Sequence, residues 1–395
     1  MNDAQNTNAA SNTPDILFSL LSYAIGGEYR RDPDELKDPR TLVKACELAD
    51  FHDLAHLIAG AVEGLSAAPE NERLLEAISK KQLHAILRSE RIDGELEAIY
   101  SLFDQEKIDY VPLKGAVIRN YYPERWMRTS GDVDILVKEV DVKRASDLLC
   151  ERLSYSFDGN GSHDILLSSP SGIHLELHFN LSDGDIAAEP LSRVWEHARD
   201  SQQSPYRKNL SDEMFLFYHI AHMVKHVKHG GCGIKPLLDL AVLEMRGLAD
   251  GASNGLLKEH GFDTFFEIAT KLSRVWFGGE AHDELTKSLE DYILRAGVYG
   301  NLQNAVAAGQ ADRGGKLKYL LSRAFLPYDV MKHVYPVLKK HKWLLPFCHV
   351  RRWLGAIFGG RASRVINETK LNATPDTENA LQVSRLMSDL GIRTN

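Results

Sequence analysis

The stretch Arg128-Thr-Ser-Gly-Asp-Val-Asp-Ile-Leu-Val137 decides the fold of this chain. Apolar and polar residues alternate in it with a period of two, which predicts a β-strand over residues 132–138. Asp132 and Asp134 then point to the same face of the strand, close enough to share one cation. Two neighbouring carboxylates repel each other unless a cation neutralises them. The stretch therefore predicts a cation-binding strand, and a solvated edge strand with two surface aspartates is the simpler alternative.

Two further segments carry groups suited to the same chemistry. Upstream, the apolar run Tyr110–Val117 is interrupted by Lys114-Gly115. A glycine between a strand and a helix lets backbone N–H groups approach a phosphate, and the lysine adds a positive charge. Downstream, Gly172–Asn180 alternates again and places Glu176 on the polar face of another strand. A glycine turn, an Asp-x-Asp strand and a later carboxylate strand are the components of two-metal nucleotidyl transfer.

The order of the elements predicts an α+β protein in which a small mixed-sheet core is flanked by N- and C-terminal helical regions. In the core, apolar spacing predicts strands at 109–113, 132–138, 163–168 and 173–179, with helices at 115–122 and 140–153. Glycine pairs and polar stretches mark the boundaries. The expected organisation is a disordered tail (1–14), an N-terminal helical region (15–105), the α/β core (106–182), a C-terminal helical region (190–360) and a mobile tail (361–395).

Three motifs resemble those of the bacterial uncharacterised nucleotidyltransferase family, within the DNA polymerase beta-like superfamily: Leu113-Lys-Gly115, Gly131-Asp-Val-Asp-Ile-Leu-Val137 and His174-Leu-Glu-Leu-His178. The resemblance extends from about Ile16 to Gly360. It implies a nucleotidyltransferase core within the flanking helices. This chain has Gly115-Ala116 where the superfamily usually has Gly-Ser or Gly-Gly, and Lys114 could substitute in holding the triphosphate.

The resemblance implies transfer of a nucleoside monophosphate from an NTP, such as ATP, to an acceptor hydroxyl. Asp132, Asp134 and Glu176 are the expected catalytic residues, and they would hold Mg²⁺ or Mn²⁺. Arg128 would either clamp a phosphate or form an ion pair with the two aspartates. The residues expected to bind the nucleotide are Lys114, Gly115, Arg128 and Ser130.

The acceptor stays open at this point. A sugar, lipid or antibiotic hydroxyl, a tRNA end and a protein side chain are all compatible with the motifs. A toxin-like nucleotidyltransferase that modifies tRNA or protein is one alternative, because Arg128–Asp134 also matches the pattern Arg-x-Ser-x-Asp-x-Asp. A catalytically inactive, nucleotide-binding member is the other, and the presence of all three carboxylates counts against it.

Histidines form a second notable pattern. His219, His222, His226 and His229 fall on one stripe of an expected helix. This stripe could bind a transition metal, face the active-site cleft, or be purely structural. We expect His222 and His226 to contact substrate in the second case, together with His178, which follows Glu176 on the same strand face.

The charge of the chain is unevenly distributed. Its net charge is −8, which argues against a protein that coats nucleic acid. Residues 314–364, however, contain eleven lysines and arginines and a single acid, Asp329, with aromatic residues between them. The segment is either a basic, solvated helix face or a surface for a polyanion such as RNA, an acidic glycan or anionic lipid.

The remaining composition favours a cytoplasmic protein. Four scattered cysteines form no Cys-x-x-Cys pair, which fits reduced thiols better than a disulfide framework or a zinc site. The N-terminus lacks the basic and apolar regions of a signal peptide. No apolar run reaches the roughly 20 residues that a membrane span requires.

Overall fold

The computed structural model describes residues 13–31, 38–65, 72–182, 187–249, 255–298, 300–312, 316–358 and 377–392. The expected disordered tail lies outside these residues, apart from positions 13 and 14, which begin a helix. The chain forms two compact units. The first contains Met1–Met223 and Ile234–Thr286, and the second contains Val224–Gly233 and Lys287–Asn395. The helical N-terminal residues and the sheet thus fall in one unit.

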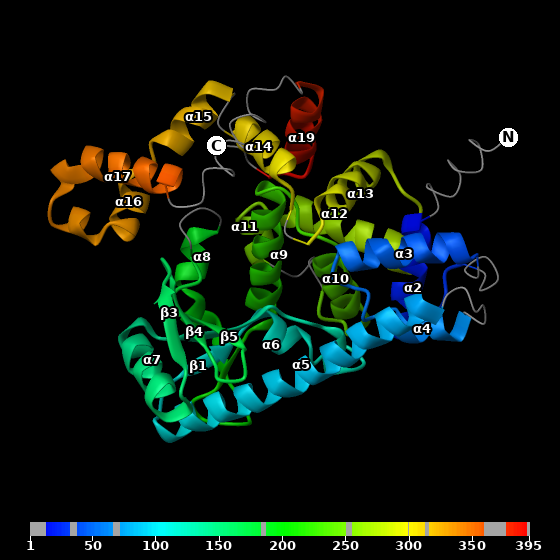
Figure 1. Ribbon diagram of the computed structural model, residues 1–395, viewed down its shortest axis with the longest axis horizontal. Helices are drawn as coiled ribbons and strands as arrows, with labels where there is room; N and C mark the ends of the chain where they lie inside the picture. Colours follow the sequence, from blue (N-terminus) through cyan, green and yellow to red (C-terminus); the bar gives the residue numbers. More distant parts are fainter. Residues whose placement is uncertain are drawn as a thin grey trace. The chain divides into compact units, whose positions relative to one another are not determined.

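Most elements lie in the first unit (Figure 1). Its strands are β1 Tyr110–Pro112, β2 Asp132–Val137, β3 Ser156–Asn160, β4 Asp164–Ser168, β5 His174–His178, β6 Ala198–Asp200 and β7 Lys208–Leu210. Its α-helices are α2 Thr13–Ala24, α3 Pro39–Phe51, α4 Ala59–Leu65, α5 Glu72–Gln105, α6 Lys114–Ile118, α7 Glu139–Leu153, α8 Ala188–Ser192, α10 Lys235–Met245, α11 Gly255–Glu259 and α12 Asp263–Ser273. Short 3₁₀ turns at Arg125–Met127 and Val194–His197 and a π-turn at Arg274–Gly278 complete it.

Helices α9 (Asp212–Lys228) and α13 (Glu284–Ala296) each belong to both units. The second unit adds α14 Leu302–Asp312, α15 Lys316–Ala324, α16 Tyr328–Val334, α17 Leu345–Phe358 and α19 Thr377–Asp389, with 3₁₀ turns at Pro336–Lys339 and Lys342–Leu344. Helix α19 differs from the mobile tail expected for 361–395. It packs against α14, and its Val383, Leu386 and Met387 are buried.

The main sheet is mixed, which confirms the predicted fold class. Its strand order is β1-β2-β5-β4-β3, with β2 and β5 parallel and the other pairs antiparallel. The strands expected near 109–113, 132–138, 163–168 and 173–179 appear as β1, β2, β4 and β5. Strand β3 was not expected, because its sequence Ser-Phe-Asp-Gly-Asn has no apolar alternation and most of it is exposed.

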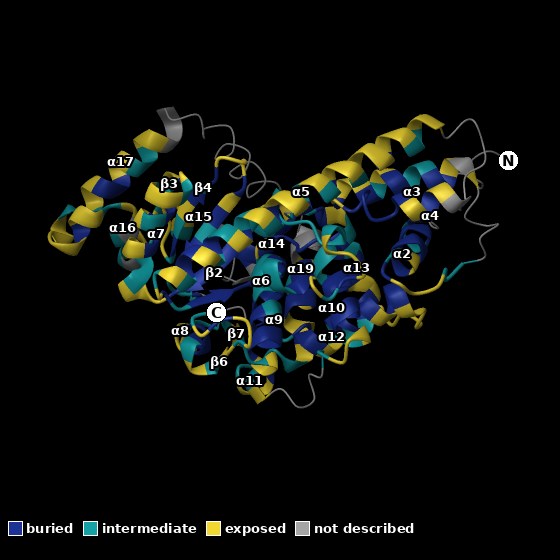
Figure 2. Cartoon of the chain, turned by 90° about the horizontal axis from the view of Figure 1, so that it is seen from below, coloured by how far each residue is buried: buried dark blue, intermediate teal, exposed yellow. Residues whose placement is uncertain are grey.

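One face of this sheet is apolar and the other is polar. Val133, Ile135, Val137, Leu175 and Leu177 form a single core with residues of α5 and α7. These two helices therefore cover the apolar face, while exposed residues line the outer side of α5 (Figure 2). Since successive side chains of a strand alternate, the intervening residues of β2 and β5 face the other way. The apolar core thus fixes the direction in which the carboxylates point.

No helix in the described part of the chain is both long and apolar enough to cross a membrane. All four cysteines are free thiols, as expected, and three of them are buried: Cys46, Cys232 and Cys348. Burial raises the pKa of the Cys46 and Cys232 thiols to about 12. These two groups are therefore protonated and unreactive at neutral pH.

The core under the sheet predicts a clear stability effect. Leu177 is fully buried on β5, so Leu177→Ala should lower the free energy of unfolding by about 2–5 kcal/mol. Val140→Ala is the matched control, because Val140 is 87% exposed on α7. Thermal unfolding of both variants measures the difference. Equal melting temperatures would mean that the sheet core contributes little to stability.

Candidate functional site

The parallel pairing of β2 with β5 brings the predicted carboxylates together. Asp134 lies opposite Glu176 in the register of the two strands. His178 Nε2 is 2.9 Å from Asp134 Oδ1 and 3.3 Å from Glu176 Oε2. Among the described residues, Asp134, Glu176 and His178 form one of the two groups whose ligand atoms lie close enough to hold a metal ion.

Asp132 lies two residues before Asp134 on the same face of β2, and its side chain is partly exposed. Burial, followed by the charges of Asp134 and Glu176, raises the pKa of the Asp132 carboxyl. The site thus concentrates negative charge that a cation would neutralise. Oxygen ligands of this kind are those that Mg²⁺ and Mn²⁺ prefer.

Lys114 supplies the positive charge within the site. Its Nζ lies 2.6 Å from Asp134 Oδ1, and both side chains are largely buried. Burial alone would raise the pKa of Asp134, but Lys114 and His178 outweigh it and hold this pKa below its usual range. Burial likewise opposes the charge of Lys114, but its neighbours Tyr218 and Asp134 raise its pKa overall. Asp134 and Lys114 are therefore both charged at neutral pH.

The turn that carries Lys114 is tightly packed. Lys114 has a positive φ of 42°, a conformation that costs a non-glycine residue of order 1–3 kcal/mol. At the next position, a Cβ on Gly115 would lie 2.0 Å from Ser130 Oγ and 3.2 Å from Ser130 Cβ, so a larger residue there would have to displace the Ser130 side chain. The Ala116 N–H donates to the Leu113 carbonyl at 3.1 Å and is already used within the protein. This turn therefore offers a phosphate fewer backbone donors than the sequence suggested.

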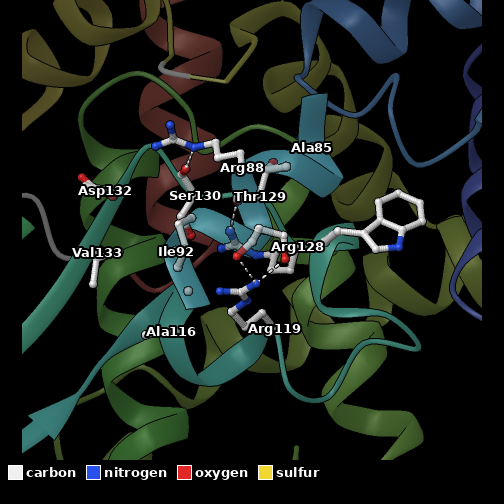
Figure 3. A pocket seen from close by; sticks show the side chains of 13 residues that line it. Ala85, Arg88, Ile92, Ala116, Arg119, Arg128, Thr129, Ser130, Asp132 and Val133 are labelled. Carbon is white, nitrogen blue, oxygen red and sulfur yellow. Dashed lines mark hydrogen bonds between the residues drawn. The ribbon is translucent and has the colours of Figure 1, made fainter. Parts of the chain in front are cut away.

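A small pocket lies between this turn and α5 (Figure 3). Arg88 of α5 donates through Nε to the Ser130 carbonyl at 2.9 Å and through Nη2 to the Gly131 carbonyl at 2.6 Å. These bonds attach the segment that leads into β2 to the long helix. Asp132 lines the same pocket beside Ser130 and Gly115. Arg88 thus helps to position the start of β2 and the Asp132 residue that begins it.

Arg128 has a different partner from the one expected. Its Nε and Nη2 lie 2.7 Å and 2.9 Å from the two carboxylate oxygens of Asp239, and its Nη1 donates to the Thr129 carbonyl at 2.6 Å. Asp239 is fully buried and also accepts a hydrogen bond from Tyr122 at 2.8 Å. Of the two roles expected for Arg128, the ion pair with Asp132 and Asp134 is therefore replaced by a bidentate pair with Asp239 of α10, and contact with a nucleotide phosphate stays a prediction.

The predicted histidines take separate roles. His178 is buried, and its Nε2 lies within hydrogen-bonding distance of Asp134 and Glu176, while the substrate contact expected for it stays a prediction. His222 lies one helical turn beyond Tyr218, with ring centroids 6.5 Å apart. His226 belongs to the second unit. Substrate contacts of His222 and His226 stay predictions, and neither metal-binding group found in the described residues includes a histidine from 219–229.

A family model described as uncharacterised nucleotidyltransferase matches residues 39–278, which is more than half of the chain. The chain belongs to this family. The match contains the whole sheet, Lys114, the three carboxylates and Asp239, and it ends well before Gly360, where the resemblance was expected to end. The family indicates nucleotidyl transfer as the general reaction. Comparisons with curated proteins and with solved structures found no match.

Sequence reasoning missed three features of this candidate site. Asp239 was not recognised as the partner of Arg128, because 111 residues separate them. Tyr218 was missed beside Lys114, although it lies on the same stripe of α9 as His222. His163, Asp164 and His178 form the second group that could hold a metal. The register that places Asp164 opposite His178 became visible only in the sheet.

The Arg128–Asp239 pair should be important for stability. Asp239→Asn leaves the buried Arg128 without its charged partner, which should cost about 3–5 kcal/mol at neutral pH. Although burial opposes it, Arg128 lowers the pKa of Asp239, so this contribution is present above about pH 4 and is lost as the pH falls further.

Thermal unfolding at neutral and acidic pH measures this effect. The control is Asp200→Asn, because Asp200 forms an exposed pair with Lys208 and its loss should hardly change the melting temperature. The melting temperatures of the Asp239→Asn variant and the native protein should converge at low pH. A constant difference across the pH range would contradict the linkage.

Proposed function

We propose that this chain transfers a nucleoside monophosphate from an NTP to an acceptor hydroxyl, with divalent cations held by Asp132, Asp134 and Glu176. The grouping of these carboxylates on one sheet face, beside Lys114, carries the proposal. A surface cluster of acids would not require a buried lysine and a buried histidine to share Asp134 Oδ1. Such a concentration of perturbed groups is typical of catalytic sites.

The residues fit a divalent cation such as Mg²⁺ or Mn²⁺. Asp132, Asp134 and Glu176 would provide its oxygen ligands. The pKa of Asp132 is raised by burial and then by the charges of Asp134 and Glu176, and a bound cation would offset both effects. Bound there, the ion would lower the pKa of the acceptor hydroxyl and neutralise charge on the leaving pyrophosphate.

The protein groups have distinct parts in this proposal. Lys114 now neutralises Asp134, and it would turn to the nucleotide phosphates once the carboxylates are otherwise neutralised. Glu176, which is partly exposed, would accept the proton of the acceptor hydroxyl. His178 positions both carboxylates, because its Nε2 lies within hydrogen-bonding distance of each. Gly115 and Ser130 shape the wall beside the phosphates.

The identity of the acceptor is not determined. One alternative is a toxin-like enzyme that modifies tRNA or protein, and the other is a protein that binds nucleotide without turnover. The deciding experiment is incubation with Mg²⁺ or Mn²⁺, each labelled NTP in turn, and a cell extract. Label in a polysaccharide, lipid, RNA or protein fraction identifies the acceptor. No label with any NTP under either metal would favour an inactive member.

Substitution of either aspartate of β2 should reduce activity, but the two substitutions should change stability in different ways. Asp132→Asn and Asp134→Asn should each reduce transfer about 10³-fold or more, since several kcal/mol of charge stabilisation are lost. Asp132→Asn should keep or raise the melting temperature, because it removes carboxylate repulsion. Asp134→Asn should lower it, because Lys114 and His178 lose their partner.

Labelled transfer and thermal unfolding measure the two effects. Asp147→Asn on the surface of α7 is the control. It removes only an exposed ion pair with Lys143, so it should leave the transfer activity and the melting temperature unchanged. Near-native turnover in Mg²⁺ by either site variant would remove that aspartate from the mechanism.

Nucleotide binding should depend on the cation. Without a divalent ion, the acidic cluster repels a triphosphate, so ATP and GTP should bind at least about tenfold more weakly in EDTA than in Mg²⁺. Isothermal calorimetry measures this directly. Mg²⁺ or Mn²⁺ alone should also raise the melting temperature, because it binds only the folded site. Equal affinity in EDTA would favour a metal-independent nucleotide-binding protein.

A further inference from the structure

Exposed apolar side chains concentrate in one part of the second unit. Residues 316–358, which form α15, α16 and α17, contain eleven of the twenty large apolar residues that are exposed in the described chain. The buried cluster that joins α16 and α17 is small and centres on Met331, Leu338 and Cys348. These helices therefore leave much of their apolar surface in solvent. Figure 2 shows exposed residues along α16 and α17. Such a concentration indicates a binding surface.

The clearest part of this surface is a stripe on α17 and the turn before it. Trp343, Phe347, Val350 and Leu354 follow helical spacing and are 69%, 66%, 48% and 49% exposed. The opposite side of the helix contains the buried Cys348 and His349. Helix α17 thus presents an apolar stripe outward, whereas a helix of a soluble protein usually buries its stripe. We call these four residues the α17 stripe.

Basic residues lie next to the α17 stripe in the sequence. Lys339, Lys340, Lys342 and Arg351 are exposed close to it in the sequence. Lys342 lies 5.2 Å from the centre of the Tyr328 ring, and Arg351 lies 5.9 Å from that of Tyr335. The net charge of the whole chain is −8, so this segment has the opposite sign of charge to the chain as a whole.

We propose that the α17 stripe binds the surface of an anionic lipid bilayer. An amphipathic helix with aromatic and aliphatic residues on one side and lysines at its margin lies in the plane of a membrane, at the boundary of head groups and acyl chains. Trp343 and Phe347 suit that boundary, and Val350 and Leu354 extend the apolar side that is buried there. The flanking lysines and Arg351 bind anionic head groups.

Other occupants fit less well. RNA-binding surfaces stack bases on aromatic rings, whereas half of the α17 stripe is aliphatic. A symmetric dimer would place the same basic patch against itself, and like charges across an interface are unfavourable. The inference does not rest on the proposed nucleotidyl transfer, because no residue of the carboxylate site lies in this segment.

Sedimentation of the full chain with lipid vesicles tests the proposal. We expect binding to phosphatidylcholine vesicles that contain about a third phosphatidylglycerol, much weaker binding to phosphatidylcholine alone, and a decrease with salt. The double variant Trp343→Ser/Phe347→Ser should bind at least about tenfold more weakly, because two exposed aromatic groups are lost. Lys339→Glu/Lys340→Glu/Lys342→Glu should abolish the preference for anionic lipid.

The matched control is Val140→Ser/Phe157→Ser, which removes two exposed apolar side chains from the first unit and should leave vesicle binding unchanged. Circular dichroism verifies that each variant is folded. Three outcomes would overturn the proposal: no binding to anionic vesicles at low salt, equal binding by the stripe variant and its control, or a dimer or a complex with single-stranded RNA that depends on the stripe while vesicles are not bound.

Discussion

The parallel pairing of β2 with β5 is the constraint on which the rest of this structure depends. It places Asp134 opposite Glu176 and lets His178 reach both. A shift of one residue would turn every side chain of a strand to the other face and send the carboxylates into the core. The apolar residues under the sheet prevent that shift, because they pack with α5 and α7. The apolar face of these strands therefore contributes to stability, and the polar face of the same strands carries the candidate chemistry.

Most of the buried charged groups in the site are paired with a group of opposite charge. Asp134 is neutralised by Lys114 and His178, and Arg128 is neutralised by Asp239. Asp132 is the exception, since burial and its acidic neighbours raise its pKa. The two pairs flank one short stretch of chain, so the segment that enters β2 is held by ionic contacts as well as by the bonds from Arg88. The imbalance at Asp132 is where an added cation would be most favourable.

The sequence predicted best where a local pattern coincides with burial. The alternation around Asp132 and around Glu176 identified β2 and β5, and the break at Lys114-Gly115 located the strand-to-helix turn. Prediction failed at β3, which lacks apolar alternation and is mostly exposed. It also failed for α19, which was expected to belong to a mobile tail, because its packing against α14 joins segments that are far apart in the sequence. A short amphipathic segment becomes a stable helix only when a partner buries its apolar side.

The sequence by itself determined which residues alternate, where the glycine turn lies, that Asp132 and Asp134 share one strand face and that Glu176 lies on the polar face of its own strand, because each of these follows from local spacing. Only the tertiary structure decided the partners. Asp239 reaches Arg128 from α10, Tyr218 approaches Lys114 from α9, and the Ser130 side chain occupies the space that a Cβ at Gly115 would need. Such contacts join residues that are far apart in the chain, and no local pattern encodes them. The outward stripe of α17 has the same origin, since periodicity reveals an apolar side but not whether a neighbour covers it.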